Sequence, residues 1–123
     1  MVERDQVALF VKRLRQCAGC EFRLERRTEN MATLAHLGMT IRDARERILA
    51  LTPADYVEGP KPRSGRPDQE AWVFSLRAQG IEVYVKVSLR LEPARCVCVS
   101  FHQAQWPLLH PYGGDSGRGR SGD

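Results

Sequence analysis

Apolar residues that recur every three or four positions predict an amphipathic helix across residues 5–17. Its buried stripe is predicted to consist of Val7, Phe10, Val11, Leu14 and Cys17. Gly19 breaks this helix. Polar and apolar residues then alternate across residues 21–25, which predicts a short edge strand with Phe22 and Leu24 turned inward.

Two short helices are predicted next. The first begins at Thr28 and ends at Gly38, where a positive φ costs little. The second begins at Thr40, and Asp43 three residues later completes the pattern of a capping box. The apolar face of this second helix is predicted to be Ile41, Ala44, Ile48 and Leu51.

Residues 57–70 show no apolar period and are rich in Pro and Gly, which predicts a long loop. Long loops inside a compact domain are uncommon and tend to be functional or mobile. The cations of this segment, Lys61, Arg63 and Arg66, favour an anionic ligand and are candidate phosphate contacts.

The last third of the chain predicts an antiparallel meander with strands at residues 71–77, 81–91 and 95–102, joined by turns at residues 78–80 and 92–94. Helices that precede a meander indicate an α+β fold, with the N-terminal helices packed on one face of a small antiparallel sheet. We expect one domain over residues 1–112 and a disordered Gly/Ser/Arg tail over residues 113–123.

Alternation with period two divides the predicted sheet into two faces. The core face is predicted to hold Val83, Val85, Val87, Leu89, Trp72, Phe74, Leu76, Val97, Val99 and Phe101. The opposite face is predicted to hold Tyr84, Lys86, Ser88, Arg90, Val73, Ser75, Arg77, Cys96, Cys98, Ser100 and His102. No acidic residue stands among its members, and like charges on one face repel, so the missing counter-ion is a candidate ligand. An ordinary solvated strand face carries similar residues, and the pattern leaves that alternative open.

Charge and composition agree with a phosphate ligand. The 123 residues carry a net charge of +4, and only three of the nineteen basic residues are Lys, namely Lys12, Lys61 and Lys86. Arginine grips phosphate through a planar fork, although an Arg-rich codon usage produces the same composition. No apolar run approaches the ~20 residues that span a bilayer, and the start MVERDQVALF lacks a cleavage site, so we expect a cytoplasmic protein that does not contact membranes.

If the ligand is RNA, this face carries groups for strand cleavage without a metal. His102 is the candidate acid or base because imidazole titrates near neutral pH. Lys86 and Arg90 would hold phosphate, and Tyr84 would donate a proton or stack on a base. The pairs Cys17/Cys20 and Cys96/Cys98 do not both have zinc spacing, and the second pair fits small strand residues. We therefore expect no cofactor and no metal.

Several blocks of the chain resemble MqsR-like toxins, the motility quorum-sensing regulator family of type II toxin–antitoxin systems. The blocks are TLAHLGMT (33–40), ILALTPADY (48–56), WVF (72–74), EVYVKV (82–87) and VSFH (99–102). The resemblance covers most of the chain, from about residue 23 to residue 102. It implies a RelE/ParE-like α+β fold and a metal-independent mRNA endoribonuclease that a cognate antitoxin protein holds inactive.

The resemblance also implies site residues. The strand Tyr and its neighbouring Lys map to Tyr84 and Lys86, and a basic residue after the VSF block maps to His102. Two positions depart from the family pattern, because its Lys after the D-[FY] pair falls on Glu58 and its Gln after the Trp falls on Val73. Lys61 or Arg63 is a candidate replacement for the missing Lys.

Two other functions fit the same residues. One is a non-catalytic nucleic-acid-binding module, which the Arg content and Glu58 favour. The other is a subunit whose basic surface meets an acidic partner protein. The chain contains no HExxH, no GxSxG, no phosphate-cradling Gly loop and no Cys–His–acid signature, so the sequence does not support a hydrolase with these motifs, a kinase or a dehydrogenase.

Overall fold

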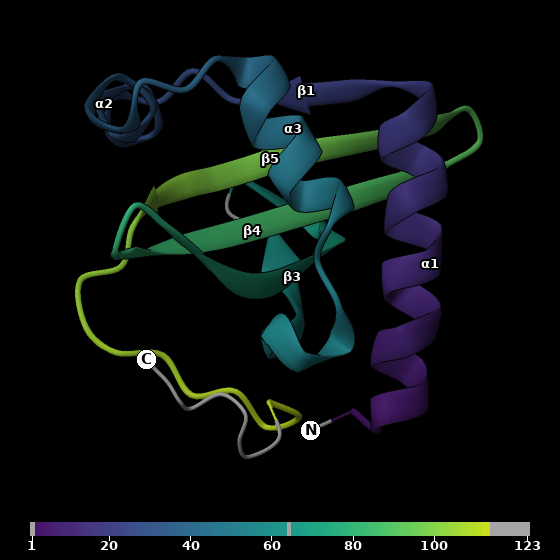
Figure 1. Cartoon of the computed structure of the whole chain (residues 1–123). Coiled ribbons are helices and arrows are strands. Elements are labelled where there is room, and N and C mark those ends of the chain that lie inside the picture. Colours follow the sequence, from purple (N-terminus) through teal and green to yellow (C-terminus); the bar gives the residue numbers. More distant parts are fainter. Residues whose placement is uncertain (1, 64, 114–123) are drawn as a thin grey trace.

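The computed structural model describes residues 2–63 and 65–113, and these form an α+β fold of three helices and a five-stranded sheet (Figure 1). In chain order the elements are α1 (Arg4–Cys20), β1 (Phe22–Leu24), α2 (Thr28–Leu37), α3 (Ile41–Leu49), the 3₁₀ turn η1 (Pro53–Asp55), β2 (Tyr56–Arg63), β3 (Arg66–Ala78), β4 (Ile81–Leu91) and β5 (Ala94–Gln103). Residues 114–123 of the predicted tail lie outside the described part. Among the described residues, no helix is long and apolar enough to cross a membrane.

The sheet is mixed, with the strand order β1-β5-β4-β3-β2. The prediction of a purely antiparallel sheet is wrong, because β1 pairs with β5 in parallel, with Arg23 opposite Val97. A parallel pair needs a long connection, and the helices and hairpins between β1 and β5 supply it. The edge position predicted for β1 is confirmed.

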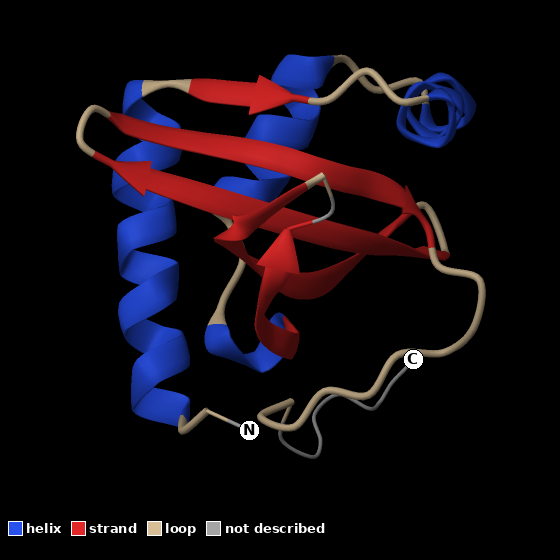
Figure 2. Ribbon diagram, turned by 180° about the vertical axis from the view of Figure 1, so that it is seen from behind, coloured by secondary structure: helices blue, strands red, loops and turns tan. Residues whose placement is uncertain are grey.

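Helices α1 and α3 cover one face of the sheet, while α2 lies alongside the edge of β5 (Figures 1 and 2). The prediction that the helices share one face therefore holds for two of them. Helix α2 takes over the edge where β1 ends: the Asn30 side chain donates to Val99 O at 3.1 Å and accepts from Phe101 N at 2.9 Å. Asn30 is fully buried, so these bonds satisfy backbone groups that no strand reaches.

Two helix signals of the sequence are wrong and two are confirmed. Gly19 does not break α1, which continues to Cys20, and Thr28 is the first residue of α2 rather than its cap, because Arg27 holds the N-cap position. Gly38 ends α2 with φ 66°, and Thr40 and Asp43 exchange the two hydrogen bonds of a capping box at the start of α3. All five predicted stripe residues of α1 are buried.

The prediction of a loop over residues 57–70 is wrong, because β2 and the first part of β3 form a hairpin there. Prolines are tolerated in β2 because it is an edge strand, and two register shifts between Tyr56 and Lys61 accommodate the extra backbone. Gly59 is required in this irregular stretch: its φ is 127°, and a Cβ there would lie 3.0 Å from Trp72 Cα.

Strict alternation along β5 is also wrong. Lys86 faces Ser100 and Val87 faces Cys98, so Val99 is an extra residue, a β-bulge, and the faces exchange at this point. Cys96 and Cys98 therefore lie on the core face, and Val97 lies opposite Ser88 on the other face. Burial raises the pKa of the Cys96 thiol to about 12.

Candidate nucleic-acid interface

Tyr84 and His102 lie side by side on the face of the sheet that is turned away from α1 and α3. They are direct partners across β4 and β5, and their rings stack with centroids 5.2 Å apart and planes 17° apart. Both side chains are half-buried. The structure thus brings together two of the three residues that the sequence predicted as catalytic.

Lys86, the third predicted residue, lies two positions along β4 from Tyr84 on the same face. Its partner on β5 is Ser100, and its partner on β3 is Val73, which in turn lies opposite Glu58 of β2. Glu58, Val73, Lys86 and Ser100 therefore form one row across four strands. Val73 and Glu58 are the two positions that depart from the toxin pattern. They follow Lys86 directly in this row, on the side of β3 and β2.

Burial, and the cations near Lys86, perturb the titration of this residue. Burial lowers the pKa of Lys86 most, and Lys61 and Arg27 lower it further, against an opposite effect of Glu58. Burial likewise raises the pKa of the Tyr84 phenol. The positive charge of Lys61, on β2, therefore acts on the ammonium of Lys86. The ammonium of Lys86 is less strongly protonated than a free lysine, and the Tyr84 phenol holds its proton more firmly than a free tyrosine.

Acidic residues lie on this face, contrary to the prediction that it has none. Glu58 pairs with Lys61, with Oε2 3.0 Å from Nζ. Glu82 lies on β4, two positions before Tyr84 and on the same face. For Glu58 the prediction failed because this residue was assigned to a loop, whereas strand pairing places it beside Val73. Glu82 belongs to the predicted strand 81–91 and alternates with Tyr84 and Lys86, so its omission from this face was an error in the assignment of alternate residues.

The orientation of the His102 ring follows from its hydrogen bond. Nδ1 lies 3.2 Å from the carbonyl oxygen of Gln103. A carbonyl only accepts, so Nδ1 carries the hydrogen and Nε2 of the neutral ring has a lone pair available. His102 is thereby prepared to take a proton through Nε2.

The C-terminal segment after β5 limits the face near Ser75. The Ser75 hydroxyl lies 3.1 Å from Glu82 Oε2 and 2.5 Å from His110 Nε2, and Leu108 N donates to Glu82 Oε1 at 3.4 Å. These residues resemble a Ser–His–acid arrangement, but Ser75 is only 3% exposed and is not accessible to a substrate. We assign this cluster to the anchoring of the C-terminal segment.

Arg77 and Arg90 lie on the predicted face but at its two ends. Arg90 is four residues from Lys86, about 13 Å at the rise of a strand, and it lies opposite Arg95. Arg77 donates to Gly80 O at 3.1 Å at the hairpin turn. Arg66 is exposed at the start of β3. None of the three is placed next to the Tyr84–His102 pair.

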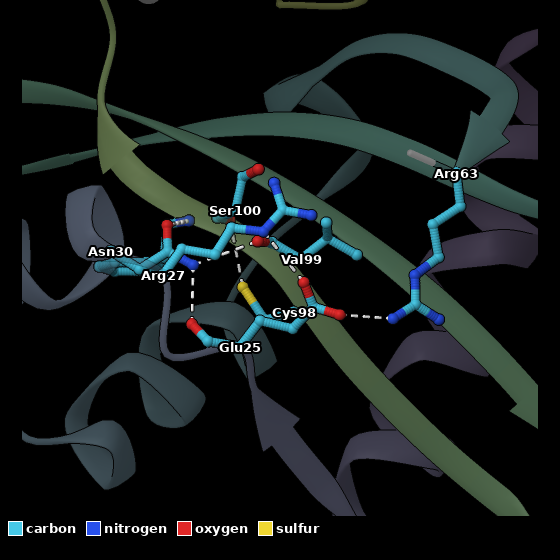
Figure 3. Close-up of polar contacts among 8 residues, drawn as sticks. Glu25, Arg27, Asn30, Arg63, Cys98, Val99 and Ser100 are labelled. Atoms are coloured by element: carbon cyan, nitrogen blue, oxygen red, sulfur yellow. Dashed lines mark hydrogen bonds and ion pairs between the residues drawn. The ribbon is translucent and has the colours of Figure 1, made fainter. Parts of the chain in front are cut away.

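Arg63 reaches across the sheet to the opposite edge. The β2–β3 hairpin leans over β4 and β5 (Figure 2), and Arg63 Nη2 contacts Glu25 Oε2 at 2.6 Å. Glu25 directly follows β1 and also binds Arg27 (Figure 3). Glu25 and Arg27 were not among the residues predicted for the site. They stand in an arginine-rich stretch over residues 23–27, and nothing in the sequence pattern links that stretch to the hairpin.

A separate groove of about 590 Å³ opens between α1 and the β2–β3 hairpin, on the helix side of the sheet. Its lining mixes apolar and oppositely charged side chains, among them Leu9, Trp72, Arg13 and Glu70. It contains none of the predicted site residues. Over the described part of the chain, no three His, Cys, Asp or Glu side chains lie close enough to hold a metal ion.

No protein-family model, no curated protein and no solved structure matches the chain.

Proposed function

We propose that the face formed by Tyr84, Lys86 and His102 binds single-stranded RNA and cleaves it, and that the protein is an mRNA endoribonuclease toxin controlled by an antitoxin protein. The observation that carries the proposal is the convergence of these three side chains. A half-buried Lys, an imidazole with a lone pair available and a firmly protonated phenol share one surface. The α+β architecture is compatible with the RelE/ParE-like fold that this proposal implies.

The proposed reaction is transesterification by the 2′-hydroxyl. His102 Nε2 removes the 2′-hydroxyl proton as the 2′-oxygen bonds to phosphorus. Lys86, with Lys61 beside it, stabilises the negative charge on the non-bridging oxygens. The bond from phosphorus to the 5′-oxygen breaks, and the Tyr84 phenol gives that oxygen its proton. The His102 imidazolium then gives up its proton to water and the Tyr84 phenolate takes one from water, which restores both groups. The products are a 2′,3′-cyclic phosphate and a free 5′-hydroxyl.

A second candidate function is binding of RNA without cleavage. The observation that favours it is Glu58, since a carboxylate next to the Lys86 row repels a phosphate and engages Lys61 in an ion pair. On this alternative the face would still bind the nucleic-acid backbone through its cations, with affinity that falls steeply with salt.

Expression of the wild type and of two variants tests the proposal. The wild type is expected to arrest growth and to fragment message. Lys86→Met and His102→Gln are each expected to lower RNA cleavage by about 10²–10⁴-fold in the purified protein, because each removes a group that acts in the transition state. Mapping of the cut sites should find 2′,3′-cyclic phosphate ends.

Arg90→Gln is the matched control, because it removes one positive charge from the same strand and the same face, but away from the site. It is expected to keep most of the activity. Binding without cleavage by the wild type would favour the non-catalytic module. Equal cleavage by the wild type, Lys86→Met and His102→Gln would overturn the mechanism.

A further inference from the structure

Two arginines from different parts of the chain converge on one carboxylate beside the proposed site. Arg27 Nε lies 3.1 Å from Glu25 Oε1, and Arg63 Nη2 lies 2.6 Å from Glu25 Oε2 (Figure 3). Each oxygen of the carboxylate thus receives one guanidinium. The trio keeps a formal charge of +1.

This trio lies at the β5 side of the proposed site. Glu25 N donates to Cys98 O at 3.0 Å, two residues before Ser100, which is the direct partner of Lys86. Arg27 is close enough to contribute to the lowered pKa of Lys86. The trio therefore lies beside Lys86, where a polynucleotide bound across Lys86 would continue.

The Arg63 guanidinium is fixed in position, but one of its hydrogen-bond donors has no acceptor among the described residues. Its side chain is 11% exposed, Nη1 donates to Gln69 Oε1 at 2.7 Å, and Nη2 binds Glu25. Its Nε is buried and has no acceptor among the described residues. A buried donor without a partner is costly, so this guanidinium can gain from a ligand that also presents an acceptor to Nε, as an ester oxygen of a phosphodiester can.

We propose that Arg27 and Arg63 form a second phosphate site, which takes the phosphodiester next to the scissile one, and that Glu25 is an internal anion that RNA displaces. The identity of the ligand as an RNA backbone rests on the proposed function. A non-bridging pair of phosphate oxygens fits the same two guanidinium groups that now grip the carboxylate. Glu25 keeps both arginines ordered and weakens binding of competing anions until a polynucleotide is present.

The test measures binding of a fluorescein-labelled 2′-O-methyl oligoribonucleotide by anisotropy. This probe lacks the attacking hydroxyl, so binding is measured whether or not the protein cleaves RNA. Glu25→Gln is expected to tighten binding about tenfold, because phosphate no longer competes with a carboxylate for charge-assisted hydrogen bonds. Glu21→Gln is the matched control, since it removes the same charge and also breaks an ion pair, with Arg95 at 3.1 Å.

Glu21→Gln is expected to change the affinity less than twofold, because Arg95 and Glu21 lie toward the far end of β5. Equal tightening by Glu25→Gln and Glu21→Gln would show an effect of net charge alone and would overturn the second phosphate site.

The triple variant Glu25→Gln/Arg27→Gln/Arg63→Gln, compared with Glu25→Gln, gives a second measurement in which neither protein carries the Glu25 carboxylate. If both arginines hold one phosphate, the slope of log affinity against log salt falls by about 0.7, the value for one phosphate of a single strand. An unchanged slope in a variant whose thermal unfolding is still cooperative would also overturn the site.

The outcomes separate this inference from the proposed function. Wild-type protein that leaves unmodified RNA intact, together with the specific effect of Glu25→Gln on the probe, supports the phosphate site and overturns the nuclease. Cleavage that is retained while Glu25→Gln and Glu21→Gln behave alike supports the nuclease and overturns the phosphate site.

Discussion

The two faces of β4 are built from alternating residues of the same strand and differ in what covers them. Val83, Val85 and Val87 are completely buried under the helices. Tyr84 and Lys86, between them, are only half-buried. No helix covers the face of the sheet that Figure 2 shows from the front. Burial of apolar side chains stabilises the fold, whereas half-burial of an ammonium among other cations costs free energy. The first face accounts for stability, and the second retains a charge arrangement that stability does not explain.

Strand β5 shows that these two faces are not set by alternation alone. Before the bulge at Val99 the core residues are Cys96 and Cys98, and after it the core residue is Phe101. His102 consequently shares its face with Tyr84 through the position of this one extra residue.

The largest expected effect contrasts neighbours on opposite faces. Phe101→Ala empties a fully buried position and is expected to lower the free energy of unfolding by about 3–5 kcal/mol. His102→Ala is expected to lower it by less than about 1 kcal/mol, because the losses are a ring contact with Tyr84 and an exposed hydrogen bond to Gln103 O, which water can replace. Urea denaturation of both variants measures the difference. Similar losses from the two substitutions would contradict the division between a stabilising face and a functional face.

A smaller loss of unfolding free energy is expected from Asn30→Ala, which tests the β5 bulge where the two faces exchange. The substitution leaves Phe101 N–H and Val99 C=O buried without partners, at an expected cost of about 2–3 kcal/mol in unfolding free energy. Hydrogen exchange at the Phe101 amide should become faster. Thr33→Val is the control: it removes a bond to the backbone of Gln103, an exposed residue that water can serve, and should cost less than about 1 kcal/mol.

The smallest effect is a shift in titration and concerns the polar face alone. The pKa of Lys86 is expected to lie below that of a free lysine, and Lys61→Met should move it upward, because Lys61 is one of the cations that lower it. Glu58→Gln should move it further down, because Glu58 acts in the opposite direction. NMR titration of ¹³C-methylated lysines measures both shifts.

The sign of the linked pH effect follows from the same direction. Because folding lowers the pKa of Lys86, the folded protein binds this proton less tightly than the unfolded chain. Stability contributed by Lys86 therefore rises as the pH increases from its folded pKa toward the ordinary lysine value. In Lys86→Met this part of the pH dependence should be absent. A wild-type Lys86 that titrates like a free lysine in both Lys61 and Lys61→Met backgrounds would contradict the electrostatic description of the face.

The parts of the fold that were predictable are those in which local pattern decides the structure. The stripe of α1, the glycine stop at Gly38, the capping box at Thr40 and the meander of β3, β4 and β5 all follow from spacing and cap chemistry. Tyr84, Lys86 and His102 were found because alternation is regular along β4 and along the last residues of β5.

The parts that were not predictable depend on partners distant in sequence. Proline in residues 57–70 argues against a strand, yet an edge position in the sheet tolerates it. The bulge at Val99 depends on Asn30, 69 residues away, which satisfies the backbone there. Neither interaction leaves a period in the sequence.

By itself the sequence determined which residues are apolar, where α2 ends and α3 begins, and that Tyr84 and Lys86 share a face, because these properties depend on neighbours within a few positions. Only the tertiary structure decided that Glu58 lies beside that face, that Cys96 and Cys98 leave it for the core, and that Arg63 meets Glu25 and Arg27 at its margin. The physical reason is that strand register and hairpin orientation are chosen by burial and hydrogen bonding summed over the whole sheet, to which each local segment contributes only a part.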